Sequence, residues 1–325
     1  MKLKTAALLS LIIPGVSSAA TINIDRDLSI SGGISGGLNF MMHPGFDQRA
    51  FNAQLDDFLV EINTPDSNKS PVDLYLGLGS ISPQIVSPSV PSAQGTPLTT
   101  GIQYGWFEYQ LNDLNFSLGH IATKVGYESS ISYQNKHISR GILWNAQPTY
   151  YPGARLTTKV ANFEVYGELT NAGPDRQAAA VGAGSQLAGL SYSFSYLNQK
   201  SGTDYVDVIV ETKVANVDVG INFDYIKVNA NNNDAIGIAA YAALSLDNIE
   251  MPVRVEYGSD NTSGIFGGSD NALTFTATPT KWIDKKTYIR GELTFTSTKN
   301  KIFQDGDGDP KNSQFTLGTQ IGVLF

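Results

Sequence analysis

Hydrophobic and polar residues alternate along most of this chain, and the last segment shows the pattern best. Its apolar and polar residues fall on opposite faces of an extended strand, because successive side chains of a strand point to opposite sides. The apolar set is Phe315, Leu317, Thr319, Ile321, Val323 and Phe325. The same alternation recurs in sixteen segments: 27–41, 52–64, 71–80, 101–111, 114–122, 151–160, 162–171, 178–187, 190–199, 205–214, 216–228, 235–246, 249–258, 270–279, 285–297 and 313–325.

Short and long connections alternate between these segments. The short ones are Asn112-Asp113, Ala161-Asn162, Ala188-Gly189, Ala215-Asn216 and Asp247-Asn248. Asn, Asp and Gly suit two-residue hairpins because they tolerate a positive φ. Each class of connection then lies at one end of an up-and-down sheet. The pattern predicts an all-β fold, an antiparallel up-and-down transmembrane β-barrel of about 16 strands with short periplasmic turns and long outer loops.

A soluble β-sandwich or β-helix is the alternative reading of the alternation. A sandwich presents a charged face to water. Here the polar face is often Gly, Ser, Thr and Asn, with scattered charges, and the apolar face is rich in Tyr, Phe and Val near the strand ends. That distribution favours a lipid-facing surface with aromatic girdles.

The first twenty residues have the features of an export signal. Lys2 and Lys4 precede a short apolar run at 6–13, and small residues follow at 18–20. The run is shorter than the ~20 residues that a membrane-spanning helix needs. We therefore expect a signal peptide over 1–20, a single barrel domain over 21–325, and a place in the bacterial outer membrane in contact with its lipid.

The composition excludes several classes of protein. The chain has no cysteine, which excludes disulfide scaffolds and thiolate metal sites. Its formal net charge of −8 argues against a nucleic-acid partner. Charged residues make up 16% of the chain, below the roughly 25% of an average soluble domain. A barrel explains this deficit, because the half of each strand that faces lipid carries no charge.

A barrel of sixteen strands encloses a water-filled channel lined by the polar half of each strand. The charged residues expected to line this pore are Glu108, Arg155, Lys159, Glu164, Glu168, Asp207, Glu211, Asp218, Arg254, Glu256, Arg290 and Glu292. The alternation also turns Glu61, Asp73, Lys213 and Asp224 inward. Acids outnumber bases by 11 to 5 in the combined set. We therefore expect a weak preference for cations, softened by screening over about 8 Å.

The longest connection, 123–150, follows the fifth strand and carries both signs of charge. The residues expected to form a constriction are Lys124, Tyr127, Glu128, Lys136 and Arg140. By analogy with general sixteen-stranded porins, this loop folds into the lumen and narrows it. The alternative is an outer loop packed over the barrel mouth.

Several short motifs gather between residues 106 and 171. They are Trp106-Phe107-Glu108-Tyr109, Leu118-Gly119, Gly126-Tyr127-Glu128, Tyr133, Ser139-Arg140, Pro148, Gly153-Ala154-Arg155 and Asn171. This stretch resembles the OmpL-like putative β-barrel porin family of bacterial outer membranes. In the family pattern a histidine stands two residues before Gly153, and Tyr151 takes its place here. The resemblance implies a passive porin with no catalytic residues.

Other chemistry has weaker support in the sequence. No G-x-S-x-G elbow accompanies His43, His120 and His137, so no catalytic residue is assigned. The aspartates of one late loop alternate with glycine, as in a calcium loop, and form a weak Ca²⁺ candidate: Asp305, Asp307 and Asp309. The full EF-hand motif is absent, because its Gly and Glu positions hold Pro310 and Thr316. No other cofactor is expected.

The sequence thus predicts a non-enzymatic outer-membrane porin that passes small hydrophilic solutes and ions by diffusion. The first alternative is a channel specific for a solute such as an oligosaccharide, with the aromatic residues of 123–150 as its guide. A barrel enzyme and a structural or adhesive barrel are further alternatives.

Overall fold

The computed structural model describes residues 22–25, 28–42, 49–64, 72–82, 84–85, 100–171, 177–199, 202–229, 233–261, 266, 269–305 and 307–325. The expected signal peptide and His43 lie outside these residues. The long strands are β2 (Leu28–Met42), β3 (Arg49–Asn63), β4 (Val72–Ile81), β6 (Gly101–Leu111), β7 (Leu114–Ala122), β9 (Tyr150–Val160), β10 (Phe163–Asn171), β11 (Gln177–Leu187), β12 (Leu190–Gln199), β13 (Thr203–Val214), β14 (Val217–Val228), β15 (Asn233–Leu246), β16 (Ile249–Asp260), β17 (Asn271–Ala277), β18 (Thr280–Trp282), β19 (Thr287–Thr298) and β22 (Ser313–Leu324).

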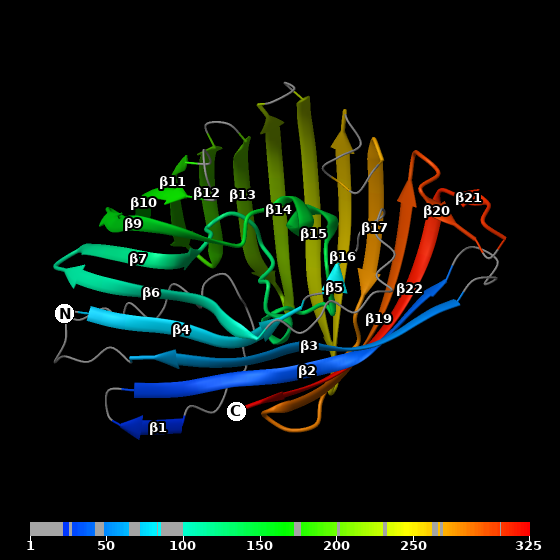
Figure 1. Ribbon diagram of the computed structural model, residues 1–325, viewed down its shortest axis with the longest axis horizontal. Helices are drawn as coiled ribbons and strands as arrows, with labels where there is room; N and C mark the ends of the chain where they lie inside the picture. Colours follow the sequence, from blue (N-terminus) through cyan, green and yellow to red (C-terminus); the bar gives the residue numbers. More distant parts are fainter. Residues whose placement is uncertain are drawn as a thin grey trace.

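These strands form one closed barrel (Figure 1). Each long strand pairs antiparallel with the next, and β22 pairs back with β2, which closes the sheet. β17 and β18 both pair with β16 and β19, so together they occupy one strand position. The result is a closed antiparallel barrel of 16 strands, which confirms the predicted fold class and strand count.

The two ends of the described chain meet at the closing seam. Phe325 exchanges two backbone hydrogen bonds with Gly32, at 3.1 and 3.2 Å. Beyond that point β1 (Ile22–Asp25) pairs with the start of β2, with Ile22 opposite Ile30. β1 thus continues the edge of β2 that β22 leaves uncovered.

The five two-residue turns form as the sequence predicts. Their first residues take positive φ angles between 51° and 54°, and three of these residues are alanines: Ala161, Ala188 and Ala215. An alanine in this left-handed conformation is strained, by about 1 kcal/mol. The close pairing of the flanking strands therefore outweighs the local preference of the turn residue.

Burial along the strands is reversed relative to a water-soluble protein. In β17, Thr274 and Thr276 are fully buried, whereas Leu273 and Phe275 are 46% and 43% exposed. The polar side faces the interior of the barrel and the apolar side faces outward. An outward apolar band of this kind is the surface that lipid covers in a membrane barrel.

The regular pairing of the barrel strands is interrupted in two ways, by an extra residue at a β-bulge and by a proline. Gln103 is the extra residue of a bulge between β4 and β6, because Gly77 pairs with Tyr104 and Leu78 with Ile102.

A second bulge lies between β2 and β3. Ser35 pairs with Asp57 and Gly36 with Leu55, so Asp56 is the extra residue of a β-bulge. The bulge turns both Asp56 and Asp57 inward, where both are fully buried.

The second irregularity lies near Pro279, which has no N–H for the strand ladder. The strand expected over 270–279 is interrupted there and then resumes as β18, which ends at Trp282. The prediction therefore ended this strand too early.

Short elements complete the structure. They are β5 (Gln84–Ile85), η2 (Ser132–Gln134), β8 (Ser139–Arg140), α1 (Ile142–Ala146), β20 (Phe303–Gln304) and β21 (Pro310–Lys311). β5 pairs in parallel with β8, whereas β20 pairs antiparallel with β21. In the described part of the chain, every helix is too short or too polar to cross a bilayer.

Candidate functional site

The connection between β7 and β9, residues 123–149, lies inside the barrel, and we call it the inner segment. Figure 1 shows it in teal and green within the space that the strands enclose. A backbone hydrogen bond of 2.8 Å from Thr123 to Thr149 closes its base. Ile131, Ile138 and Ile142 within it are at most 1% exposed. The segment is a packed part of the interior, and its polar groups must find partners on the barrel wall.

Carboxylates of the wall hold the backbone of the inner segment. Glu292 of β19 accepts the N–H groups of Ile138 and Ser139, at 2.7 and 3.0 Å. Asp57 of β3, which β22 and β2 separate from β19, accepts the N–H of Ser132. Glu256 of β16 accepts the N–H of Leu143 at 3.2 Å. Bonds from amides to a charged acceptor are stronger than neutral ones.

Two arginines of the wall bind carbonyl oxygens of the same segment. Arg290 of β19 donates to Asn135 at 2.7 Å and to Ser132 at 3.0 Å. Arg254 of β16 donates to the carbonyl oxygen of Ser139 at 3.0 Å. These contacts and those of the carboxylates come from β3, β16 and β19, which lie on one arc of the barrel together with β17, β22 and β2, so the segment is fastened to that arc of the wall.

Arg140 organises the segment from within. Its guanidinium donates to the carbonyl oxygens of Ser129, Ser130 and Ile138, at 2.6, 3.1 and 3.1 Å. The side chain is fully buried. Burial lowers the pKa of Arg140 from its usual value, and the nearby Asp57 carboxylate opposes that shift. A guanidinium keeps its charge in proteins.

His137 is buried at the point where the segment meets β19. Thr278 donates its hydroxyl hydrogen to Glu292 at 2.8 Å, and Nδ1 of His137 lies 2.8 Å from the same hydroxyl oxygen. Because that hydrogen is already used, Nδ1 must carry a hydrogen and donate it to Thr278. Burial, followed by the charge of Arg254, lowers the pKa of His137 well below 6.5.

Three further side chains of the segment contact the wall: Lys124, Tyr127 and Lys136. Lys124 lies 3.6 Å from Glu164, and burial lowers the pKa of Lys124. Lys136 binds Glu250 near the short-turn end of β16. The ring of Tyr127 stacks on that of Tyr241, with 4.1 Å between centroids.

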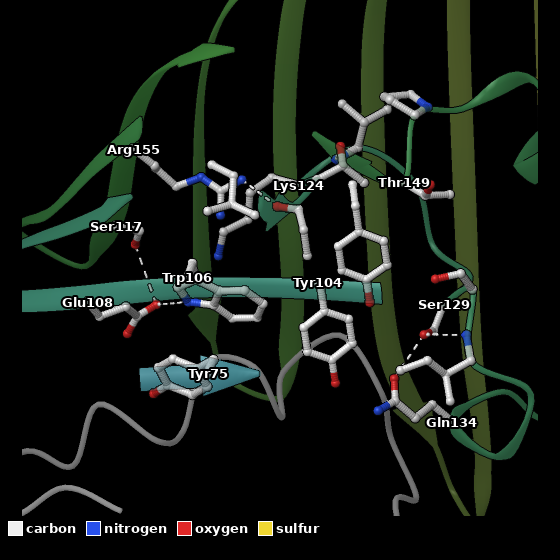
Figure 2. A pocket seen from close by; sticks show the side chains of 18 of the residues that line it. Tyr75, Tyr104, Trp106, Glu108, Ser117, Lys124, Ser129, Gln134, Thr149 and Arg155 are labelled. Carbon is white, nitrogen blue, oxygen red and sulfur yellow. Dashed lines mark hydrogen bonds between the residues drawn. The ribbon is translucent and has the colours of Figure 1, made fainter. Parts of the chain in front are cut away.

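A cavity of about 480 Å³ remains between the inner segment and the wall formed by β3, β4, β6, β7, β9 and β10. Figure 2 shows the rings of Trp106 and Tyr104 beside each other along this wall, with the ring of Tyr75 below that of Trp106. Tyr75 and Trp106 are stacked at 4.9 Å, and Tyr104 and Tyr150 at 5.1 Å. The cavity therefore has an aromatic side, and its remaining lining is mostly polar.

The twelve charged strand residues predicted to line the pore all lie on the inward face of their strands. Seven are buried: Arg155, Glu168, Asp207, Arg254, Glu256, Arg290 and Glu292. Glu108, Glu164, Glu211 and Asp218 are partly exposed, and Lys159 is exposed near a short turn. The structure brings four of them onto the backbone of the inner segment as anchors: Arg254, Glu256, Arg290 and Glu292. That solute passes over the set remains a prediction.

The five residues singled out in the loop 123–150 have different surroundings. Arg140 is an internal brace, and Tyr127 packs on the wall. Glu128 accepts hydrogen bonds from Arg254 and from the N–H of Gly141, the latter at 2.7 Å. Lys124 and Lys136 form the ion pairs described above.

Sequence reasoning missed Asp57 and the row of cavity aromatics. Asp57 escaped because the bulge at Asp56 breaks the alternation, although two adjacent aspartates within an apolar strand are a signal of irregular geometry. Tyr75, Trp106 and Tyr104 lie on two neighbouring strands. Their strand register, which the sequence pattern leaves open, brings them together.

In the loop between β19 and β22, Asp305 binds groups of the loop itself, whereas the sequence suggested that the aspartates there could bind calcium. Asp305 accepts the N–H groups of Asp307 and Asp309, at 3.1 and 2.8 Å, and lies 2.8 Å from Lys311. The hydrogen bond from Lys311 lowers the pKa of Asp305. In the described part of the chain, no three His, Asp or Glu side chains gather as metal ligands. Calcium binding here stays a prediction.

Comparison with protein families gives a match over nearly the whole chain. The family described as putative beta-barrel porin-2, OmpL-like, matches residues 27–325. The chain belongs to this OmpL-like porin family. No curated protein matches the sequence. The motifs between 106 and 171 thus pointed to the right family.

Solved structures share the fold of this OmpL-like porin. An anion-selective porin from Comamonas acidovorans has 11% identity and a TM-score of 0.67, over 92% of this chain and 99% of that one. DcaP of Acinetobacter baumannii has 11% identity and 0.67, over 94% and 100%. OmpF of Salmonella typhi has 9% identity and 0.66, over 94% and 100%.

Family and fold together settle the general function. The OmpL-like porin is an outer-membrane β-barrel channel of the Gram-negative type. Its family and its structural neighbours are channels, not enzymes. Because the sequence identity to these solved porins is low, the solute and the ion selectivity of this chain have to be inferred from its own residues.

Proposed function

We propose that small hydrophilic solutes and ions diffuse passively through this barrel alongside the inner segment, which acts as its constriction. The observation that carries the proposal is the fastening of residues 123–149 across the interior by Asp57, Glu256 and Glu292. A loop held by charged anchors narrows a pore permanently, because the lost bonds would leave buried polar groups unpaired. Solute would then pass through the part of the lumen that contains the cavity.

The channel is expected to prefer cations weakly. Five acidic and two basic side chains line the cavity: Glu61, Asp73, Glu108, Glu128, Glu164, Lys124 and Arg155. Negative charge in a narrow, water-filled passage raises the local concentration of cations. The anion selectivity of the Comamonas porin belongs to that protein, with 11% identity to this chain.

The absence of cysteine allows a direct test of path and charge. Gln134→Cys places one thiol at the cavity, and Leu118→Cys places one on the outward face as a matched control. In planar bilayers, a positively charged methanethiosulfonate should reduce the current of Gln134→Cys and react faster than a negatively charged one. The control should not respond. Equal rates for both reagents, or no block at Gln134→Cys, would contradict the proposed path or preference.

Two alternatives receive little support from the described residues. Two tyrosines of the inner segment are held by the barrel wall and do not serve as a guide for oligosaccharides, because Tyr127 stacks on Tyr241 and Tyr133 donates to Glu61. For an enzyme, His137 is buried against Thr278, and His120 lies on β7 in edge contact with Tyr150. We therefore propose a channel without catalysis. Liposome swelling with graded sugars, and unchanged swelling in His120→Ala, test this statement.

A further inference from the structure

The wall beside the cavity changes from polar to apolar along its height. On the inward face of β6, Gln110 lies near the short turn, and Trp106 and Tyr104 follow toward the end of the barrel that carries the long connections, which we call the long-loop end. Gln110 is exposed, whereas Trp106 and Tyr104 are 6% and 5% exposed. Ile121 of β7 and Tyr151 of β9 are buried near the same end. The cavity is therefore accessible to water at its short-turn end and apolar at its long-loop end.

The inner segment closes the apolar end of the cavity with the side chain of Ile131. This side chain is 1% exposed and belongs to one buried cluster with five side chains of the wall. The five are Leu59 of β3, Tyr104 and Trp106 of β6, Ile121 of β7 and Tyr151 of β9. Figure 2 shows the ring of Tyr104 between that of Trp106 and the part of the inner segment that carries Ser129 and Gln134. Ile131 therefore fills the space between the segment and four strands of the wall.

Ring contacts and hydrogen bonds keep this seal closed. The ring of Tyr104 stacks on that of Tyr150, with 5.1 Å between their centroids and 9° between their planes. Glu61 of β3 accepts the hydroxyl of Tyr104 and, at 3.0 Å, the hydroxyl of Tyr133 from the inner segment. One carboxylate thus joins a ring of the wall to the segment. The ring of Tyr104 cannot turn aside without losing these contacts, so the seal is closed at rest.

The backbone beside Ile131 is held in place, which decides how the seal opens. Ser132, the next residue, donates its N–H to Asp57, and its carbonyl oxygen accepts a hydrogen bond from Arg290. The segment therefore stays at this position while the side chains of the seal rearrange. An apolar constriction stops ions whenever it is dry, because water and ions find no polar partners in it.

We propose that Ile131 and the five wall side chains around it form a hydrophobic gate at the long-loop end of the cavity, and that ions and solutes cross when water enters this gate. The apolar surface of the gate sets how often water enters. The inference rests on the proposed function, because the gate lies on the path proposed there for solute. It adds that the path is limited at one end and accessible at the other.

Two substitutions of similar shape separate the polarity of the gate from its size. Valine and threonine differ little in volume, but threonine adds a hydroxyl that binds water. The refolded full chain carries potassium current in planar bilayers, and the measured quantity is the current per channel averaged over openings and closures. Ile131→Thr should carry about threefold to thirtyfold more average current than Ile131→Val, as the transfer cost of one hydroxyl predicts.

Ile142→Thr is the matched control. Ile142 is also 1% exposed, but it packs in the cluster formed with β14, β15 and β17, away from the cavity. The new hydroxyl is buried in the same way, so Ile142→Thr carries a similar cost to folding. Its average current should match that of the wild type.

A second measurement leaves the gate unchanged. Gln134→Cys places one thiol in the cavity, and a charged methanethiosulfonate is added to one side of the bilayer or, in a separate membrane, to the other. The thiol should react at least about tenfold faster from one side, as for a gate that is open at most about a tenth of the time. Adding Ile131→Thr should speed the slow side and leave the fast side unchanged. Since the first comparison keeps Ile131, it decides the proposal even where Ile131→Thr fails to fold.

The outcomes separate the two proposals. If neither the wild type nor Ile131→Thr conducts, the porin proposal itself is contradicted. Equal reaction of the cavity thiol from both sides, in a chain that conducts, overturns the gate alone. Equal currents of Ile131→Val and Ile131→Thr also overturn the gate, as does an equal increase of current in Ile142→Thr.

Discussion

Replacing Glu292 with glutamine should release one stretch of the inner segment and leave the barrel intact. The carboxylate accepts the N–H groups of Ile138 and Ser139 and the hydroxyl of Thr278. Glutamine has the same shape but only one oxygen. Whichever way its amide turns, one accepting oxygen is lost to an NH₂ group. At least one partner then faces a donor, and the remaining bonds lose their charge assistance.

The expected cost follows from the number and kind of these bonds. A hydrogen bond to a charged group contributes about 1.5 to 3 kcal/mol, and an unpaired buried donor costs a similar amount. One lost bond and a weakened remainder then sum to roughly 2 to 4 kcal/mol. Since about 1.4 kcal/mol corresponds to tenfold, the amides of Ile138 and Ser139 should exchange hydrogen about thirtyfold to several hundredfold faster.

Hydrogen exchange read by mass spectrometry on the inner segment measures this directly. Glu250→Gln is the matched control, because among the described residues Glu250 binds the side chain of Lys136 and not a backbone N–H, and Glu250 is partly exposed. A pair of that kind contributes at most about 1 kcal/mol, so its amides should change less than tenfold. Equal effects of the two variants would refute the anchoring role of Glu292. So would loss of protection throughout the barrel strands.

Three further predictions concern pH, packing and turns. The folded-state pKa of His137 lies below 6.5, so the stability that neutral His137 contributes is present above about pH 6.5 and is lost as the pH falls. Hydrogen exchange of the backbone amides of the inner segment should therefore become faster in acid in the wild type. The increase should be smaller in His137→Gln. Gly141→Ala should destabilise the packing of the inner segment by about 1 to 3 kcal/mol, because the added methyl group would lie 2.0 Å from Glu256. Trypsin should then cleave this variant faster than the wild type. The control is Gly167→Ala, because Gly167 has open space around it, and trypsin should cleave this variant at the rate of the wild type. Ala188→Gly should stabilise the barrel by about 0.5 to 1 kcal/mol in urea unfolding, because it relieves a φ of 51°; no gain would mean that the turn is not strained.

The strands and their tight turns were predictable because both depend on local pattern. Alternation over ten residues assigns faces without knowledge of partners, and Asn112 or Asp247 mark turns through a backbone preference of single residues. The misplaced end at Pro279 has a local cause as well. The bulges at Asp56 and Gln103 depend on the neighbouring strands, where Ser35 and Gly36, and Gly77 and Leu78, have no residue opposite them.

For the candidate site, the sequence predicts which side chains point into the barrel but not which groups they bind. Alternation turned Glu292 and Arg290 inward, but it carries no information about what they bind. Their partners, Ile138 and Asn135, lie more than 150 positions away in the sequence. Such pairings exist only after the barrel has closed and brought distant walls around one segment, so no local pattern records them.

The closing seam has a consequence for the order of assembly. Phe325 bonds to Gly32 at the seam, and Ser132 is held both by Asp57 from the first third of the chain and by Arg290 from the last part. Asp57 and Arg290 come together around Ser132 only after β22 has paired with β2 and closed the barrel. The inner segment therefore cannot settle in an unfinished barrel, and its protection from proteases reports that the last step of membrane insertion has taken place.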